Sequence, residues 1–347
     1  MSKLQSKYNK FHKTIKISQQ DDEYKKAKEK DDLILSKIKI AFKEEGYPVK
    51  SNFRVGSFAV GSAIKSICDD HSDIDRAIVI SEEDSPEDPL APKKVIKSVL
   101  KKHGFKTPLI KKPCVTADYE SKPIHLDYTV YKKLSWCGGY ELAIGKEQSN
   151  EDNKYWDESE PKELLEWINN NVNHKSFLFD LTNDEYDQFI RIIRYLKRWR
   201  DFTYTNEKDR ALVYSIGLTI MAREQFVPHI GDDGANDNKA FEDTIRNILN
   251  EGPYFISKGD DKYDLEVMLP VSPYREVFQN HGVTVGTKLY KQFSKLLNKL
   301  EKVEETRSLK KQCEILRDLL GDDFPEEDVS SKASSESAGY VGTTNVA

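Results

Sequence analysis

Apolar residues recur with helical spacing along several stretches of the chain. The clearest is residues 184–201, where they return every three or four positions and predict an amphipathic helix. Its apolar stripe consists of Phe189, Ile192, Ile193, Leu196 and Trp199. The same spacing predicts an earlier helix, which ends at Gly46-Tyr47-Pro48 and has Leu33, Ile34, Ile38 and Phe42 on its apolar side. Further helices are predicted at residues 94–103, from about residue 160, and at residues 212–225, 243–250 and 287–320.

Two other stretches predict β-strands, whose successive side chains point to opposite faces. The first strand lies at the end of residues 55–80, and its Ile74, Ile78 and Ile80 are expected to face the core. Residues 113–131 predict two more strands around a polar turn at residues 120–122. In the second of these, one face carries Ile124, Leu126, Tyr128 and Val130, and the other carries His125, Asp127, Thr129 and Tyr131.

Changes in composition divide the chain. Residues 136–157 are rich in Gly, Asn, Lys and Glu and are predicted to form a junction, which places a domain boundary near residue 160. Beyond residue 325 large apolar residues are scarce and Ser is frequent, so the tail is predicted to be disordered. The expected organisation is a first domain at 1–160, a helical domain at 161–325 and a tail at 326–347.

Bulk composition fits a sizeable enzyme of the cytoplasm. The 347 residues carry 54 basic and 59 acidic side chains, a formal net charge of −5 that argues against a surface gripping a nucleic-acid polymer. The four cysteines lack zinc-ligand spacing and are interpreted as reduced thiols. No apolar run approaches the length that spans a membrane, and the start of the chain lacks the apolar segment of a signal peptide, so no membrane association is expected.

The candidate chemistry centres on residues 55–80, VGSFAVGSAIKSICDDHSDIDRAIVI. Asp73 and Asp75 are two apart on a predicted strand, so both carboxylates should leave the same side. Two such acids repel each other and lose hydration, and a divalent metal is the expected compensation. Upstream, Gly56 and Ser57 predict a tight turn whose N–H groups and hydroxyl could hold phosphate oxygens. This combination predicts phosphoryl or nucleotidyl transfer.

Asp127 is a third acid, in the middle of a strand that is otherwise rich in β-formers. A lone aspartate there would favour an edge position facing solvent. Beside Asp73 and Asp75 it favours a third metal-binding carboxylate on a neighbouring strand, as two-metal catalysis requires.

The helix at 184–201 also carries a row of basic residues, with Arg194 and Lys197 on one face. Such a row is commonly a solvated surface or a partner for acidic residues, but beside a phosphate site it would neutralise a triphosphate. Ser215 is the polar exception near the start of the apolar helix at 212–225, and it could simply bond to backbone. Residues 229–239 are rich in Asp and Gly but lack the spaced acids and final Glu of a calcium loop, so calcium is excluded.

These residues resemble the nucleotidyltransferase superfamily of DNA polymerase β. The resemblance rests on Gly56-Ser57, on Ser72-Asp73-Ile74-Asp75 and on Asp127 in the segment HLDYTV. More narrowly, the chain is similar to the bacterial cyclic-oligonucleotide synthases of anti-phage defence, relatives of animal cyclic GMP-AMP synthase and oligoadenylate synthase. GSFAVGSAI, RIIRYLKRWRD, the region from YELAIGKEQS to LLEWI, and the C-terminal helical region ending in GDDFP support this narrower match, which covers roughly residues 30–325.

The resemblance implies an α+β fold, with a polymerase-β-like mixed sheet, flanking helices and a helical oligoadenylate-synthase-like second domain, as two lobes around a cleft. It implies that Asp73, Asp75 and Asp127 hold two Mg²⁺ ions, for which Mn²⁺ can substitute. It further implies that Gly56 and Ser57 contact the donor's phosphates, and that a triphosphate is clasped by Lys197 and Ser215. Nucleoside triphosphates, ATP among them, are the implied substrates. The zinc-binding insertion of animal cyclic GMP-AMP synthase, a DNA sensor, has no counterpart here, so no double-stranded DNA activator is expected.

Three functions stay open at this stage. The first is the synthesis of a cyclic di- or trinucleotide messenger that acts through a downstream effector. The second is nucleotidyl transfer to another acceptor, such as an RNA end, a small molecule or a protein. The third, a non-catalytic nucleotide-binding or scaffold protein, is disfavoured because all three carboxylates are present. In related systems an E1/E2-like partner conjugates the synthase's C-terminus, and the tail ending at Ala347 could serve such a partner or be inert.

Overall fold

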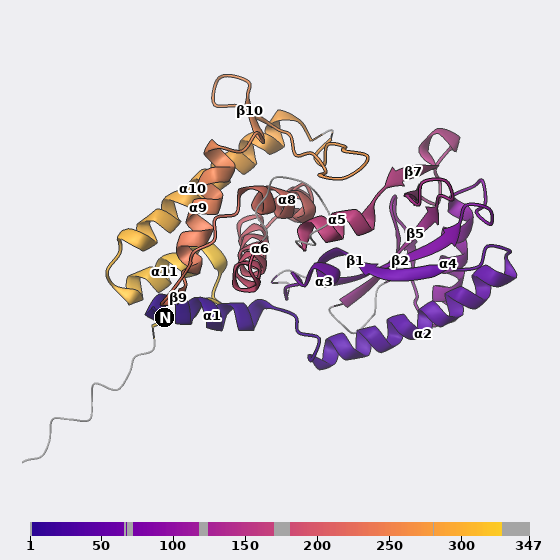
Figure 1. Cartoon of the computed structure of the whole chain (residues 1–347), viewed down its shortest axis with the longest axis horizontal. Coiled ribbons are helices and arrows are strands. Elements are labelled where there is room, and N and C mark those ends of the chain that lie inside the picture. The colour runs from indigo at the N-terminus through magenta and orange to yellow at the C-terminus, as the bar shows by residue number, and fades with distance from the viewer. Residues whose placement is uncertain are drawn as a thin grey trace, which may run out of the picture.

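A mixed sheet and a group of helices form the two ends of the molecule (Figure 1). The computed structural model describes residues 2–65, 67, 72–117, 124–169, 181–279 and 281–327. The sheet has the order β1-β2-β5-β4-β3, and β6 and β7 extend it from β5. Its strands are β1 (Ser51–Val55), β2 (Ser72–Ser81), β3 (Leu109–Ile110), β4 (Val115–Ala117), β5 (Ile124–Lys133), β6 (Tyr140–Ile144) and β7 (Tyr155–Ser159).

The two central strands, β2 and β5, run parallel, and the other pairs in the sheet are antiparallel. Two helices, α2 (Asp22–Glu44) and α4 (Leu90–Lys102), pack on one face of the sheet. Ile74, Ile78 and Ile80 are buried on that face, as the alternation predicted. The same layer includes Leu126, Tyr128 and Val130 of β5. The opposite face of the central strands is therefore left to carry Asp75 and Asp127.

A buried ion pair fixes β2 to α2. Arg76 donates through Nε to Asp31 Oδ2 at 3.1 Å and makes a second, shorter bond from its guanidinium. Asp31 is fully buried, whereas Asp32, which accepts from the same guanidinium at 3.2 Å, is exposed. Arg76 is adjacent in sequence to Asp75, so this pair anchors the strand at the point where the candidate site begins.

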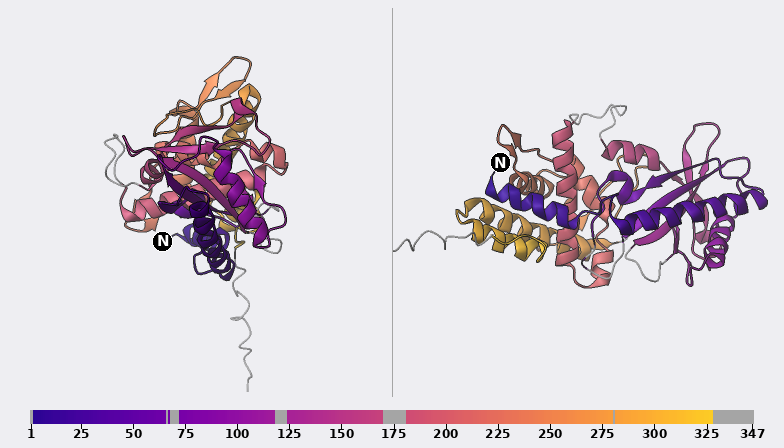
Figure 2. Two further views of the ribbon diagram at one scale, coloured as in Figure 1. Left: turned by 90° about the vertical axis from the view of Figure 1, so that its right-hand side faces the viewer. Right: turned by 90° about the horizontal axis from the view of Figure 1, so that it is seen from below.

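The second lobe is helical and includes the N-terminal helix. Tyr8, Phe11 and Ile15 of that helix, α1 (Lys3–Ile15), belong to the same buried cluster as the apolar stripe of α6 (Asn183–Thr203). Figure 2 shows α1 lying along the helical lobe, while α2 continues along the sheet. The helices of this lobe are α1 (Lys3–Ile15), α6 (Asn183–Thr203), α7 (Glu207–Ala211), α8 (Ser215–Gln225), α9 (Asp237–Asn250), α10 (Gly282–Glu305) and α11 (Leu309–Leu320).

Smaller elements include a short 3₁₀ helix, Glu151–Asn153, between β6 and β7. Helix α5 (Pro161–Ile168) lies between the two lobes and contacts both α3 (Gly56–Val60) and α8. Two short hairpins, β8 (Ile230–Gly231) with β9 (Gly234–Ala235) and β10 (Phe255–Ser257) with β11 (Tyr263–Leu265), belong to the helical lobe. None of the helices in the described residues is long and apolar enough to cross a membrane.

The structure corrects three sequence predictions. Residues 136–157 contain β6 and the start of β7, because Tyr140, Ala143 and Ile144 can be buried against the sheet despite the polar residues around them. The predicted helix at 287–320 is two helices, separated at residues 306–308, where Ser308 caps the second one. Leu33 is exposed, although its helix is present. The tail prediction lies outside the described residues beyond residue 327, and the domain division near residue 160 stays a prediction.

Candidate active site

The predicted Gly-Ser turn begins a one-turn helix, α3, at the end of β1. Gly56 has φ +67°, a backbone conformation that favours glycine. A Cβ atom at this position would lie 1.9 Å from Oδ2 of Asp75. Glycine is therefore required both by the backbone and by the close approach of the chain to the Asp75 carboxylate.

Asp75 and Asp127 are directly opposed in the parallel pair β2–β5. Residues opposed in this way point to the same face of a sheet, so the structure brings together two of the three predicted carboxylates. Both side chains are partly buried. One oxygen of Asp127, Oδ1, is buried and has no hydrogen-bond partner in the described structure, although buried carboxylate oxygens are normally satisfied.

The third predicted carboxylate, that of Asp73, lies outside the described side chains. Its backbone belongs to β2 and is opposed to His125 in β5. Among the side chains that the structure describes, no group of three or more His, Cys, Asp and Glu is arranged to hold a metal ion. The predicted three-carboxylate site is therefore represented here by the Asp75–Asp127 pair.

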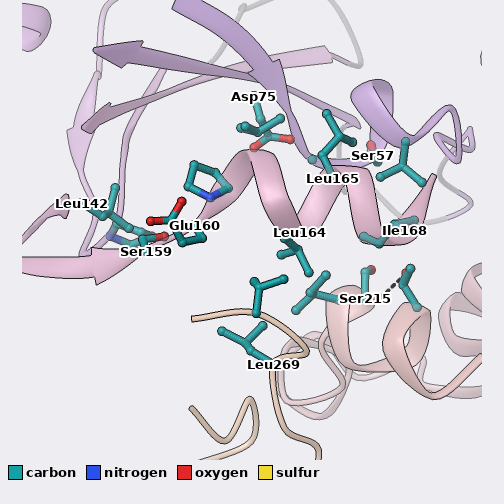
Figure 3. A pocket seen from close by; sticks show the side chains of 18 of the residues that line it. Ser57, Asp75, Leu142, Ser159, Glu160, Leu164, Leu165, Ile168, Ser215 and Leu269 are labelled. Atoms are coloured by element: carbon teal, nitrogen blue, oxygen red, sulfur yellow. Dashed lines mark hydrogen bonds between the residues drawn. The ribbon is translucent and has the colours of Figure 1, made fainter. Parts of the chain in front are cut away.

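A cavity of about 670 Å³ lies between the sheet and the helical lobe (Figure 3). It lies within the range of about 300–1,000 Å³ that is typical of small-molecule sites. Five of the predicted site residues line it, namely Gly56, Ser57, Asp75, Lys197 and Ser215. They come from α3, β2, α6 and α8, which are far apart in the sequence. Asp127 does not line the cavity, but it is the strand partner of Asp75, which does.

Lys197 connects the helical lobe to the loop that follows α3. Its Nζ donates to Ser62 Oγ at 2.9 Å and to the Ser62 carbonyl at 3.3 Å. Burial, and after it the positive charges of Arg200 and Arg194, lower the pKa of Lys197 to about 7. Because Arg194 and Lys197 are both buried, the solvated-surface interpretation of this basic row is wrong.

Ser215 accepts a hydrogen bond from the guanidinium of Arg200. Arg200 also donates to Asp201 Oδ1 from Nε at 2.8 Å, and both residues line the cavity. The Ser215 hydroxyl is therefore bonded to a charged side chain rather than to backbone. Arg200 is a cavity residue that sequence reasoning missed, although its spacing of three from Lys197 on a helix was a usable signal.

A bridge between the lobes borders the same cavity. Arg275 donates from its guanidinium to the Asp157 carboxylate and to the Glu158 carbonyl of β7. Ser272 donates to the Glu158 carboxylate. Arg275, Ser272 and Asp157 line the cavity, and no sequence pattern linked Asp157 to the other two because it lies more than a hundred residues before them.

The remaining wall is largely apolar. Leu164, Leu165 and Ile168 of α5 face the cavity together with Leu142 and Leu269 (Figure 3). Glu160 lies among them at the start of α5, and burial raises the pKa of its carboxyl group. The cavity thus combines an apolar region with a polar region around Ser57, Asp75 and Lys197, an arrangement that suits a nucleotide.

Cys114 contacts the candidate site through the Asp127 carboxylate. Its thiol donates to Asp127 Oδ2 at 3.4 Å, and burial raises the pKa of Cys114 to about 12, so the thiol is protonated. The sequence offered no signal for this contact, because Cys114 belongs to no cysteine pattern. The three described cysteines, Cys114, Cys137 and Cys313, form no disulfide.

Comparison with solved structures identifies the architecture. No family model matches the chain, and no curated protein matches it in sequence. The structure of the CD-NTase CdnG from Bradyrhizobium diazoefficiens in complex with GTP is similar over 92% of this chain and 96% of its own, with TM-score 0.65 and 16% identity. The chain has the CD-NTase fold.

Two further solved structures agree with this CD-NTase architecture. CdnC from E. coli MS115-1 with ATP is similar over 92% of this chain and 98% of its own, with TM-score 0.62 and 12% identity. The cyclic AMP-GMP synthase DncV from Vibrio cholerae is similar over 80% of this chain and 70% of its own, with TM-score 0.59 and 15% identity. The predicted fold class, an α+β sheet core with a helical second lobe, is confirmed. The resemblance stated from the sequence is thereby confirmed at the level of the fold.

Proposed function

We propose that the protein is a metal-dependent nucleotidyltransferase that joins nucleoside triphosphates into a cyclic di- or trinucleotide and releases pyrophosphate. The observation that carries this proposal is the opposed pair Asp75–Asp127, with Asp75 in contact range of the Gly56 turn at the edge of a nucleotide-sized cavity. CD-NTases with this fold have been solved with GTP and with ATP, which supports nucleoside triphosphates as the ligands.

The polar end of the cavity supplies the groups that a triphosphate needs. Ser57 offers a hydroxyl, Lys197 an amino group and Arg200 a guanidinium group. Lys197 is held by Ser62 and Arg200 by Asp201 and Ser215, so both basic groups are ordered before a ligand arrives. Preordered basic groups bind phosphate oxygens at a lower entropic cost than mobile surface lysines.

The carboxylates fit a divalent ion. Oδ1 of Asp127 is buried and has no hydrogen-bond partner among the described residues, and Asp75 shares its face of the sheet. Together with Asp73, these residues would hold Mg²⁺ or Mn²⁺, which prefer carboxylate oxygens. When bound, the ion would lower the pKa of the acceptor hydroxyl and neutralise charge on the pyrophosphate leaving group.

The reaction forms one bond and breaks one. The oxygen of a ribose hydroxyl attacks the α-phosphorus of a second nucleotide, and the bond from that phosphorus to the oxygen bridging to the β-phosphate breaks. Pyrophosphate leaves with the bond electrons, and the hydroxyl proton passes to a base, a role that we assign to the Asp127 carboxylate. Lys197 and Arg200 would orient the triphosphate for in-line attack, and positioning of this kind supplies most of the catalysis in phosphoryl transfer. A second such step within the same product closes the ring.

The experiment incubates the purified protein with α-labelled triphosphates and Mg²⁺ or Mn²⁺, followed by phosphatase. Label protected as an internal phosphodiester, with a product mass matching a cyclic oligonucleotide, supports the proposal. Asp75→Asn and Asp127→Asn should each lower the rate by at least about 100-fold. Asp32→Asn removes an exposed acid away from the cavity and serves as the control. A strict requirement for an added acceptor would show transfer to another substrate instead, and no turnover would contradict catalysis.

The wider setting is part of the same proposal. A cyclic nucleotide made from cytoplasmic triphosphates would act through a downstream effector, and anti-phage defence is the setting expected from the sequence resemblance. The tail at 326–347 could be the substrate of an E1/E2-like conjugating partner. Truncation after Pro325 tests this last point, since unchanged protection of cells against phage would count against such a partner.

A further inference from the structure

The two oxygens of the Asp127 carboxylate have different surroundings. Oδ2 accepts a hydrogen bond from the thiol of Cys114, with a sulfur–oxygen distance of 3.4 Å. Oδ1 is buried and has no hydrogen-bond partner in the described structure. The thiol therefore occupies one oxygen and leaves the other available.

Cys114 is held firmly where it makes this contact. Its side chain is only 5% exposed, and its carbonyl accepts from the Lys111 backbone N–H at 2.9 Å. Its sulfur lies 3.6 Å from Oγ1 of Thr116, which is itself the cross-strand neighbour of Asp127. Polar contacts thus connect the Asp127 carboxylate to the Cys114 thiol, and that thiol to the Thr116 hydroxyl.

We propose that Cys114 is a positioning residue: its thiol fixes the rotation of the Asp127 carboxylate so that Oδ1 is presented to the metal ion. This inference rests on the proposed function. The final side-chain torsion of an aspartate is broad. Without a hydrogen-bond partner on one oxygen, the carboxylate could rotate and its two oxygens could exchange places. Outer partners that orient metal ligands are worth about 10–100-fold in metal affinity or activity. Because a thiol is a weak donor, it can orient the carboxylate while withdrawing little charge from it.

The test measures binding of Mn²⁺ alone to the nucleotide-free full-length protein by electron paramagnetic resonance. Cys114→Ala removes the donor and should weaken Mn²⁺ binding about 10-fold, the lower end of that range. Cys114→Ser keeps a donor in a side chain of similar shape and should stay within about 3-fold of the wild type. Cys313→Ala is the matched control, because Cys313 is also a buried thiol but lies in α11, within the core of the helical lobe.

The outcomes separate this inference from the proposed function. Product formation by the wild-type protein decides the function, and the ratio of Mn²⁺ affinities decides the role of Cys114. A wild type that makes product while Cys114→Ala binds Mn²⁺ normally overturns the positioning role alone, as does an equal loss in the Ala and Ser variants. A wild type that binds no Mn²⁺ overturns the positioning role, and a wild type that forms no product overturns the proposed function.

Discussion

Gly56 and Asp75 approach so closely that a single methyl group on the glycine would lie 1.9 Å from the Asp75 carboxylate oxygen. The distance is far below any contact that carbon and oxygen tolerate, so the α3 turn and the β2 strand are matched to each other. This explains physically why a Gly-Ser turn and an Asp on the next strand occur together. The turn packs directly against the acid that the proposed chemistry uses.

Gly56→Ala should therefore displace Asp75 and lower nucleotidyl transfer by at least about 100-fold. It should also destabilise the fold, because alanine is disfavoured at φ +67°. Gly61→Ala is the matched control, since Gly61 has φ +75° but nothing within 4 Å of the added Cβ. Both variants should lose about 1 kcal/mol of stability to backbone strain, measured by urea unfolding. Equal activity in the two variants would show that the contact between Gly56 and Asp75 does not affect the rate of nucleotidyl transfer.

Much of the fold was predictable from residue pattern. The alternation around Ile74, Ile78 and Ile80 assigned one face of β2 to the core, and the stripe from Phe189 to Trp199 located α6. Helix α1 packs with the helical lobe, and strands β6 and β7 join the sheet, through contacts between residues far apart in the chain. Such elements are chosen by tertiary packing rather than by local pattern, which is why a short, polar-flanked stretch like 140–144 was missed.

The residues of the candidate site likewise fall into two groups: those that a local sequence motif predicted and those that only the folded structure brings together. Residues within one local motif, such as Gly56, Ser57 and Asp75, could be recognised because turn chemistry and strand alternation act over short distances. Cys114 and Arg275 could not, because each meets its partner only after the chain has folded. The burial of Lys197 was equally invisible, since the helix that carries it is basic on more than one face.

The buried pair Arg76–Asp31 predicts a large loss of stability when it is broken. Asp31→Asn leaves the Arg76 charge without its buried counter-ion, which typically costs about 3–5 kcal/mol. Asp32→Asn is the control, because Asp32 bonds the same guanidinium but is 54% exposed and should cost less than about 1 kcal/mol. Urea unfolding measures both. Similar small losses in the two variants would mean that the strand next to Asp75 is not held by this pair.

The interlobe bridge predicts an effect on substrate affinity. Arg275→Ala removes the bonds from the helical lobe to Asp157 and Glu158, so the cavity should close less well over a nucleotide. Arg275 is 40% exposed, so a loss of at most about 1 kcal/mol is expected, which is about a fivefold rise in KM. Steady-state kinetics at low and high salt checks this, since screening should shrink the difference. Lys288→Ala breaks an exposed pair with Asp209 within one lobe and should leave KM unchanged.

Lys197 predicts a specific dependence of stability on pH. Its folded-state pKa is lowered to about 7 from the ordinary 10.5, first by burial and then by neighbouring cations. Between these values the unfolded chain binds more protons than the folded one, so the free energy of unfolding contributed by this group rises with pH. Below pH 7 both states are protonated and the full penalty of a buried charge remains. Lys197→Met should therefore be more stable than the wild type at pH 6, with the advantage shrinking toward pH 10.

Triphosphate binding should reverse the shift of Lys197. Phosphate charges favour the protonated amine, so its pKa should rise on binding, and at pH 8 the complex should take up a proton from solution. Titration calorimetry in two buffers with different ionisation enthalpies measures this uptake. Lys197→Met should abolish the buffer dependence, whereas the exposed Lys208→Met should keep it. Buffer-independent binding by the wild type would place the triphosphate away from Lys197, because a dehydrated amine beside three phosphates could not stay neutral at that pH.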